Sequence, residues 1–422
     1  MLIFTAIVVG CTRDLPDAGG DEPWTVVADS SGDTIRIRID GAIPARLVRA
    51  LVPELRVGAA DGAEEETFGS VDYVFGTADD GLLIYDGQAK AARLFDGGGR
   101  FVRRVGATGE GPGEHGHLNG ITRLPDGDWV FWDAPGGRLN RYTYAGDFRG
   151  TVRLPIHGWF LQDGLRSDTA SLLYAWSVLS RNAQTGEFES EGLIQLDTLG
   201  GVRDTVVYPL WGPEPAVLTA QSADGGSSRV QGVPWSGGSA SALTQAGGLV
   251  SGFGTEYVFY LLPSAGRPVR VERAHQRVAV SSTEASERRA QITQRMRQVN
   301  PAWTWTGPAL PTVKPAYRSL KVGEDGRVWV QLSTVGENIP ADELADVPTT
   351  PDPPVQLSTL EPDLYDVYSP DGRLLGRVAP PPRTRLLRFA GTYVWGVQQD
   401  SLDVSYAVRF RIFPAFEPEE RP

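Results

Sequence analysis

Cysteine and histidine are scarce in this sequence, and their scarcity limits the chemistry that the chain can carry. Among 422 residues there are one cysteine, Cys11, and four histidines. A single thiol cannot form an internal disulfide or a metal site built from several cysteines. With so few histidines, a histidine-rich metal centre is not expected either, and we predict no resident metal or cofactor.

Clustered positive charge is also missing. The formal net charge is −12, and residues of both signs are spread along the chain. Binding to a phosphate backbone needs a clustered basic face, so we expect no nucleic-acid partner. The sequence contains no G-x-S-x-G elbow, no H-E-x-x-H motif and no P-loop. It therefore carries no signature of a serine hydrolase, a zinc protease or a nucleotide-binding enzyme.

Turn-forming residues are abundant by contrast. The chain has 50 glycines and 31 prolines, while 41% of its residues are hydrophobic. This composition favours many short strands joined by turns around a sizeable core, rather than a helical or disordered chain.

The N-terminus carries a short apolar run, LIFTAIVVG, directly before Cys11. A run too short to span a bilayer that ends in a small residue is typical of a signal peptide. The tetrad VVGC resembles a bacterial lipobox, and the resemblance implies that residues 1–11 are a signal peptide with a lipidated cysteine. The alternative is a buried N-terminal strand with an incidental cysteine.

The lipobox resemblance also implies a location. Residues 12–28 are polar and contain Gly and Pro, which suits a flexible tether, and several acyl chains on one cysteine give stable anchoring. Thr12 rather than Asp follows the cysteine, which in such families implies the outer membrane. We therefore expect a monomeric cell-envelope lipoprotein, anchored to the outer membrane by its lipid and facing the periplasm or the cell surface.

An internal repeat is visible between residues 70 and 154. Segment 70–105 divides into four β-rich runs separated by turn residues, and segment 118–154 repeats this plan. The Tyr85-Asp86 pair falls opposite Trp132-Asp133 at an offset of 47 residues (133 − 86). Four strands every 40–50 residues or so are the signature of a propeller blade.

Less regular units continue this pattern to the end of the chain, near residues 157–208, 239–280, 319–378 and 386–413. The sixth unit shows three strands, and an open ring would leave an exposed sheet edge. We predict that Thr34–Ile39 or Leu55–Val57 supplies the missing strand and closes the ring.

The predicted fold is therefore all-β, a six-bladed β-propeller of four-stranded antiparallel blades. It covers residues 29–415 and is followed by an acidic tail at 416–422. Two stacked sandwiches, the alternative, explain neither the period nor the leftover strands.

Three segments interrupt the repeat. Residues 209–240 are rich in Gly, Ser and Pro and predict a long surface excursion. Residues 281–300 predict the one short helix, and residues 337–362 form an acidic loop with several prolines. Loops of this length are usually either functional or disordered, and the sequence does not decide between the two.

The predicted helix begins with a capping box formed by Ser281 and Glu284. Its apolar face carries Ile292, Met296 and Val299, and its polar face carries Arg288, Arg289, Arg295 and Arg297. We expect a helix that packs against a blade edge with a solvated basic face. The alternative is a small basic patch for an acidic partner or a lipid headgroup.

The segment GATGEGPGE (106–114) follows the first repeat directly. It resembles the G-x-x-G-x-G-P-G-E loop of bacterial six-bladed propeller lipoproteins related to NHL-repeat and TolB-like propellers. Further matching pieces are DSSG (29–32), the strand containing Trp329, and the ending at 392–412. The sequence departs from the pattern at His115, where such loops carry an aromatic residue. The resemblance implies an architecture and an envelope location rather than an activity.

The same stretch supplies the candidate axial-face residues, because blade-to-blade loops line the mouth of a propeller. They are Glu110, Glu114, His115, His117 and Asn119. We expect a structural role, with the glycines shaping a tight crossing and a glutamate accepting backbone N–H groups. The alternative is an acid–base or metal-binding loop, in which a divalent cation such as Ca²⁺ would serve a lactonase-type hydrolase.

Tryptophans in loops are the candidate partner contacts. Five of the eleven tryptophans fall in predicted strands, where they fit inter-blade packing, whereas Trp159, Trp211 and Trp235 fall in loops or at loop edges. Without a catalytic constellation in the sequence, we predict a non-catalytic scaffold that binds a protein, peptide or glycan partner. The alternative is the metal-dependent propeller enzyme.

Overall fold

The computed structural model describes residues 24–77, 79–154, 164–181, 188–213, 215–340, 344 and 353–416. Cys11, Trp159 and residues 417–422 lie outside the described residues. Phe416, which the sequence assigns to the tail, is buried against Trp329 of the fifth blade.

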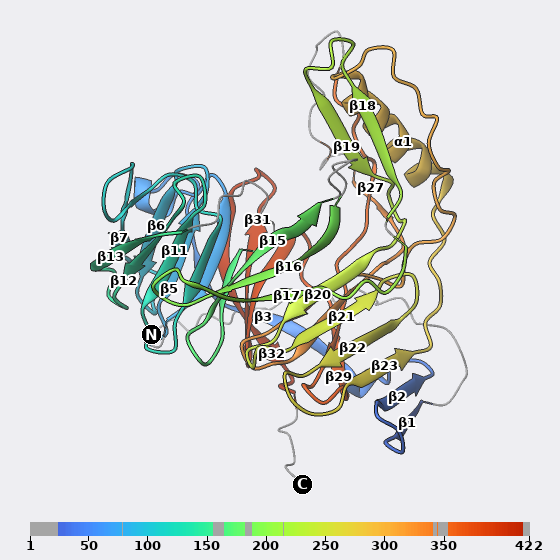
Figure 1. The fold of residues 1–422 in the computed structure, drawn as a ribbon, viewed down its shortest axis with the longest axis horizontal. Coiled ribbons are helices and arrows are strands. Elements are labelled where there is room, and N and C mark those ends of the chain that lie inside the picture. Colours follow the sequence, from blue (N-terminus) through green and yellow to red (C-terminus); the bar gives the residue numbers. More distant parts are fainter. Residues whose placement is uncertain are drawn as a thin grey trace, which may run out of the picture.

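The first three blades each follow one another in the chain as four antiparallel strands (Figure 1). Blade 1 contains β4 (Val71–Gly76), β5 (Leu82–Asp86), β6 (Ala91–Phe95) and β7 (Phe101–Val105). Blade 2 contains β10 (Gly120–Arg123), β11 (Trp129–Asp133), β12 (Arg138–Tyr142) and β13 (Phe148–Arg153). Blade 3 contains β14 (Leu165–Ser167), β15 (Leu173–Arg181), β16 (Phe188–Leu196) and β17 (Val202–Val207).

The other three blades have the same order but carry the insertions and the N-terminal strands. Blade 4 contains β20 (Ser239–Leu243), β21 (Leu249–Phe253), β22 (Val258–Leu262) and β23 (Val269–Arg273). Blade 5 contains β24 (Tyr317–Val322), β25 (Val328–Leu332), β28 (Tyr365–Tyr368) and β29 (Leu374–Val378). Blade 6 contains β30 (Thr384–Ala390), β31 (Tyr393–Gln399), β32 (Ser405–Phe413) and, from the N-terminal part of the chain, β3 (Val48–Val57). The prediction of an all-β six-bladed propeller is confirmed.

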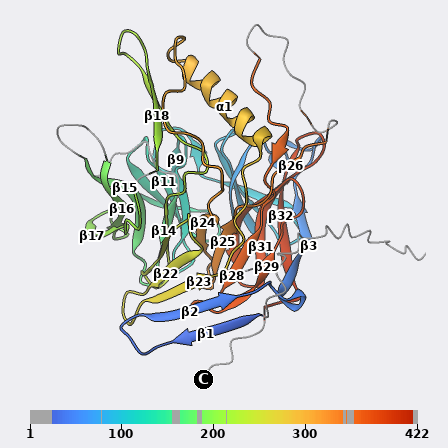
Figure 2. The ribbon, with the colours of Figure 1, turned by 90° about the vertical axis from the view of Figure 1, so that its right-hand side faces the viewer.

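The N-terminal strands are shared between two blades. β3 pairs antiparallel with β32 from Ala50 to Val57 and so takes the fourth position of blade 6. β2 (Ile35–Asp40) instead pairs in parallel with β23 and extends blade 4, and β1 (Thr25–Asp29) pairs with β2 outside it (Figure 2). β1 begins at Thr25, inside the segment 12–28 that the sequence predicts as tether, because its β-branched residues pair with β2.

Adjacent blades share a buried apolar layer. The rings of Phe75 in blade 1 and Trp129 in blade 2 have centroids 5.7 Å apart, and those of Trp329 in blade 5 and Phe389 in blade 6 are 4.3 Å apart. Trp395 of blade 6 belongs to the same buried cluster as β4 and β5 of blade 1. Tightly packed aromatic rings of this kind contribute much of the burial in a core, and the core continues from the sixth blade to the first.

One end of the blades carries all three insertions. Since neighbouring strands are antiparallel, blade-to-blade connections and the connections between second and third strands emerge at the same end, which we call the entry face. Residues 208–238 join blade 3 to blade 4, residues 274–316 join blade 4 to blade 5, and residues 333–364 join β25 to β28. Loop 106–119 also lies at this end.

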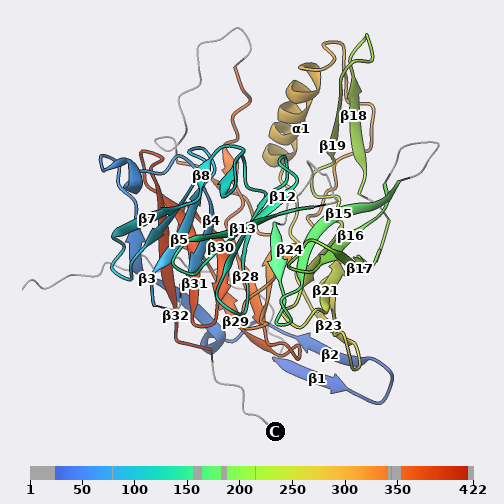
Figure 3. The ribbon, with the colours of Figure 1, turned by 60° about the vertical axis from the view of Figure 1, so that its left-hand side comes forward.

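The insertions pack on one another to form what we call the insertion lobe. It consists of β18 (Val217–Gln221), β19 (Ser228–Gly232), α1 (Ser282–Arg297), β26 (Glu337–Asn338), β27 (Thr359–Leu360) and their flanking residues. Figure 3 shows α1, β18 and β19 projecting from the ring at the end opposite to β1 and β2. No helix in the described ranges is long and apolar enough to cross a membrane.

The predicted helix is confirmed, including its capping box at Ser281 and Glu284. Its predicted packing against a blade edge is wrong, because the buried side chains of Ile292 and Met296 lie against the hairpin β18–β19. The hairpin offers them Leu218 and Ala220, which alternate with exposed residues along β18. The surface excursion and the helix therefore bury each other's apolar faces.

Candidate functional site

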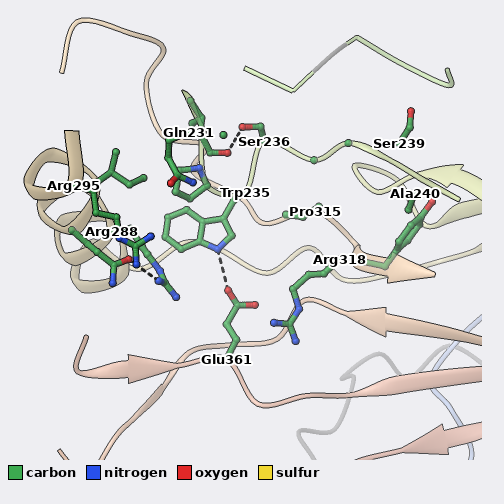
Figure 4. Close-up of a pocket in the computed structure, with 18 residues that line it drawn as sticks. Gln231, Trp235, Ser236, Ser239, Ala240, Arg288, Arg295, Pro315, Arg318 and Glu361 are labelled. Carbon is green, nitrogen blue, oxygen red and sulfur yellow. Dashed lines mark hydrogen bonds between the residues drawn. The ribbon is translucent and has the colours of Figure 1, made fainter. Parts of the chain in front are cut away.

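A cleft of about 490 Å³ lies between the insertion lobe and the first strands of blades 4 and 5 (Figure 4). Ligand-binding clefts commonly have volumes of about 300–1,000 Å³. Side chains from all three insertions and from the start of β24 contribute to its lining. They include Gln231, Trp235, Arg288, Arg295, Arg318 and Glu361.

Trp235 is held in an unusual backbone conformation within this cleft. Its φ is +59°, in the left-handed region that a bulky residue rarely adopts. The indole Nε1 donates to Glu361 Oε1 at 3.0 Å, and the ring lies between α1 and Glu361 in Figure 4. Backbone strain that surrounding contacts maintain is common at ligand-binding sites. The strain and the hydrogen bond together fix the indole at the cleft.

A buried ionic network lies next to the cleft and includes Glu361 of its lining. The side chain of Lys314 is fully buried, and its Nζ lies 3.2 Å from Glu361 Oε1 and donates to Thr334 O at 2.9 Å. The same Nζ also pairs with Glu284, the capping-box glutamate of α1. Burial alone would raise the pKa of Glu284, but hydrogen bonds from Lys314 and Ser281 lower it below its usual value. The carboxylate is therefore ionised, and the helix N-terminus is tied to the cleft.

The arginines around the cleft differ in their partners. Arg318 donates to Asp363 Oδ1 at 2.8 Å, so its charge is matched. Arg288 donates to Gln291 Oε1 at 3.1 Å. Within the described residues, neither Arg288 nor Arg295 has a carboxylate at ion-pair distance.

The two other arginines of α1 are used inside the lobe. The guanidinium of Arg289 lies 5.2 Å from the centroid of the Trp305 ring, and Arg297 Nε donates to Trp303 O at 3.1 Å. The basic face predicted from the sequence is therefore divided: Arg288 and Arg295 line the cleft, whereas Arg289 and Arg297 hold the chain that follows the helix.

The predicted axial-face loop is bound to blade 2 through its backbone. The buried guanidinium of Arg138 pairs with Asp133 at 2.9 Å and donates to Gly109 O at 2.8 Å. Asn140 Nδ2 donates to Glu114 O at 2.7 Å, and the Tyr142 hydroxyl donates to Gly113 O at 2.9 Å. The loop thus has the structural anchoring expected of a tight crossing between blades.

The side chains of this loop have different environments. Glu110 and His117 are exposed, whereas Glu114 Oε2 accepts the Gly111 N–H at 2.8 Å. The backbone carbonyl of Asn119 accepts the Tyr73 hydroxyl at 2.9 Å, whereas its side-chain Oδ1 is buried without a hydrogen-bond donor among the described residues. Among the described residues there is no group of three or more His, Cys, Asp or Glu side chains that could hold a metal ion.

His115 is a buried core residue. Its ring is 1% exposed and lies 6.1 Å from the Tyr85 ring and 5.8 Å from the Phe131 ring, centroid to centroid. Burial lowers the pKa of His115 to about 4, so the imidazole is neutral at physiological pH. His115 therefore packs as a neutral aromatic ring, like the aromatic residues that similar loops carry at this position.

The three candidate tryptophans do not lie in one site. Trp211 stacks on Tyr260 with ring centroids 4.1 Å apart, and its Nε1 donates to Ser251 Oγ at 2.7 Å. Both partners belong to blade 4, so Trp211 covers that blade. Trp235 lies in the cleft, and Trp159 lies outside the described residues. Sequence reasoning missed Arg318 and Glu361, since neither carries a motif. Glu361 reaches Trp235 only where two insertions meet, and Arg318 lies at the start of β24.

Comparison with known proteins supports the architecture. Residues 64–209 match the sequence model of the DUF5128 family, described as a 6-bladed beta-propeller. No curated protein matches the sequence. The solved structure of a DUF4221 family member from Bacteroides vulgatus is similar with a TM-score of 0.51 and 12% identity, over 87% of this chain and 99% of that one.

Two further solved structures are similar at lower scores. One is a protein of Bacteroides fragilis described as exported, with a TM-score of 0.47 and 11% identity over 89% of this chain and 99% of that one. The other is virginiamycin B lyase from Staphylococcus aureus, with a TM-score of 0.38 and 10% identity over 92% of this chain and 99% of that one. The chain is a six-bladed β-propeller, and within it residues 64–209 are similar to the DUF5128 family.

Proposed function

We propose that the protein is a monomeric cell-envelope lipoprotein whose propeller binds a protein, peptide or glycan partner in the cleft beneath the insertion lobe. The observation that carries this proposal is the cleft itself, which three separate insertions build around a strained, hydrogen-bonded tryptophan. Large aromatic and arginine side chains are the residue types that dominate binding energy at interfaces. The sequence VVGC supports export and lipidation at Cys11.

The proposal assigns no catalytic role. The loop that suggested a lactonase-type enzyme is engaged with blade 2, and its glutamates and histidines face different surroundings. The cleft, by contrast, combines an aromatic ring, amide groups and arginines, which suits recognition of a ligand with both apolar and polar parts.

Binding can be tested with arrayed peptides and glycans and the purified Cys11→Ser protein. Probes that bind are titrated against this protein and against its Trp235→Ala and Trp211→Ala derivatives. We expect Trp235→Ala to weaken binding about tenfold or more, and Trp211→Ala to leave it unchanged, because Trp211 does not line the cleft. Probes insensitive to Trp235→Ala, or no binding by either array, would overturn the proposal.

A further inference from the structure

Two arginines of α1 present unmatched positive charge to the cleft. Arg288 and Arg295 both line it, and seven residues of helix separate them by about 10 Å along the axis. Seven residues make nearly two full turns, so both side chains leave the same face of the helix. Arg288 has a neutral partner in Gln291, and Arg295 has no side-chain partner among the described residues.

The acidic residue that lines the cleft is already committed. Glu361 accepts from the Trp235 indole at 3.0 Å and lies 3.2 Å from the buried Lys314 ammonium. Lys314 also pairs with Glu284, so this one cation and the two carboxylates carry one net negative charge, against the two positive charges of Arg288 and Arg295. Because Arg318 is matched by Asp363, these groups together leave one net positive charge at the cleft, although the whole chain has a net charge of −12.

Distance explains how an acidic protein can hold a local cationic site. At physiological ionic strength, interactions between exposed charges are screened over about 8 Å. A ligand inside the cleft experiences Arg288 and Arg295 more strongly than the carboxylates spread over distant blades. Guanidinium groups also bind carboxylates in a two-pronged geometry, which gives direction as well as attraction.

We infer that the ligand of the cleft is an acidic peptide segment, whose carboxylates pair with Arg288 and Arg295 while an apolar side chain packs on Trp235. This inference rests on the proposed binding function of the cleft. An extended peptide advances about 3.3 Å per residue, so acidic side chains two to four residues apart are about 7–13 Å apart, a range that includes the separation of the two arginines. Gln231 and Gln291 can both donate to and accept from the peptide backbone.

The test uses fluorescence anisotropy with three labelled probes and the purified Cys11→Ser protein. The first is a short peptide rich in Asp and Glu with one tryptophan, the second is the same peptide with every acid replaced by its amide, and the third is an oligouronate. Binding is measured with the parent chain and with R288Q/R295Q. The matched control is R289Q/R297Q, which removes the same charge from the same helix outside the cleft.

We expect the acidic peptide to bind at least about tenfold more tightly than its amide form, and R288Q/R295Q to remove that preference. R289Q/R297Q should keep it. Circular dichroism of both double variants checks that α1 is retained, since glutamine and arginine have similar helix propensities.

Three results would overturn the inference. They are equal binding of the acidic and amide peptides, an unchanged preference in R288Q/R295Q, or binding of the oligouronate alone. In each of these cases, a probe whose binding is weakened by Trp235→Ala still binds in the cleft, so the proposed function stands. Failure of the proposed function itself would instead appear as probe binding that Trp235→Ala does not change.

Discussion

Trp235 and Glu361 are 126 residues apart in the sequence, and one hydrogen bond of 3.0 Å joins them at the wall of the cleft. The bond connects the insertion before blade 4 to the insertion within blade 5. Lys314, in the segment that leads from α1 to blade 5, lies against the same carboxylate. The cleft therefore exists only where all three insertions meet, and its geometry depends on the buried charges that hold them together.

Replacement of Lys314 tests this dependence. Lys314→Met leaves the carboxylates of Glu284 and Glu361, with side chains 6% and 15% exposed, without their cation. Removal of one member of a buried ion pair costs about 3–5 kcal/mol, so we expect a loss of that size in the free energy of urea unfolding. The control Arg277→Met breaks the exposed pair with Glu256, which should cost less than about 1 kcal/mol. Equal stability of the two variants would contradict the role given to Lys314.

The pH dependence of stability tests the buried His115. Its folded-state pKa of about 4 lies below the value of about 6.5 for an unfolded chain. Between these values the unfolded chain binds a proton that the folded chain does not, so stability falls as the pH is lowered from 6.5 towards 4. At pH 5 the loss from this residue is about 2 kcal/mol.

His115→Phe keeps an aromatic ring between Tyr85 and Phe131 and removes the titration. We expect its unfolding free energy to decline less than that of the parent chain between pH 7 and pH 5, by about 2 kcal/mol. A remaining slope is expected, because burial also lowers the pKa of His275 to about 4. If both proteins lose the same stability over this interval, His115 is not the buried neutral group described above.

The blades could be predicted because each repeats a local pattern. The pairs Tyr85-Asp86 and Trp132-Asp133 both end second strands, and in each case the aspartate accepts backbone N–H groups at the following turn. Such a turn is determined by a few neighbouring residues, so it can be recognised in the sequence. Counting the strands limits the one missing from the sixth unit to two candidates, and β3, which contains Leu55–Val57, pairs with β32.

The cleft could not be predicted, because its parts do not repeat. Glu361 belongs to an acidic loop and Arg318 to the start of a strand, and neither residue type in those places indicates a site. Their meeting with Trp235 depends on how the hairpin β18–β19 and α1 pack on each other. Conversely, His115 looked like a site residue in the sequence, and only its burial shows that it belongs to the core.

Lipidation at Cys11 gives a prediction about location. In a bacterial host that acylates lipoproteins, the native chain should appear in the membrane fraction and incorporate labelled palmitate. Cys11→Ser should move it to the soluble fraction, because loss of the acyl chains removes the hydrophobic anchor. Equal membrane association and labelling of both proteins would contradict the lipobox interpretation of VVGC.

The joint between blade 6 and blade 1 gives the last prediction. Val57 of β3 pairs with Ala407 of β32 and is 3% exposed in the apolar cluster that the two blades share. Val57→Asp places a carboxylate there without a cation. An uncompensated buried charge costs about 3–5 kcal/mol, so we expect lower unfolding free energy and aggregation during size-exclusion chromatography. Val27→Asp in β1 is the matched control, since Val27 is 59% exposed and should change stability by no more than about 0.5 kcal/mol. A monomeric Val57→Asp protein as stable as this control would mean that β3 contributes little to the joint between the two blades.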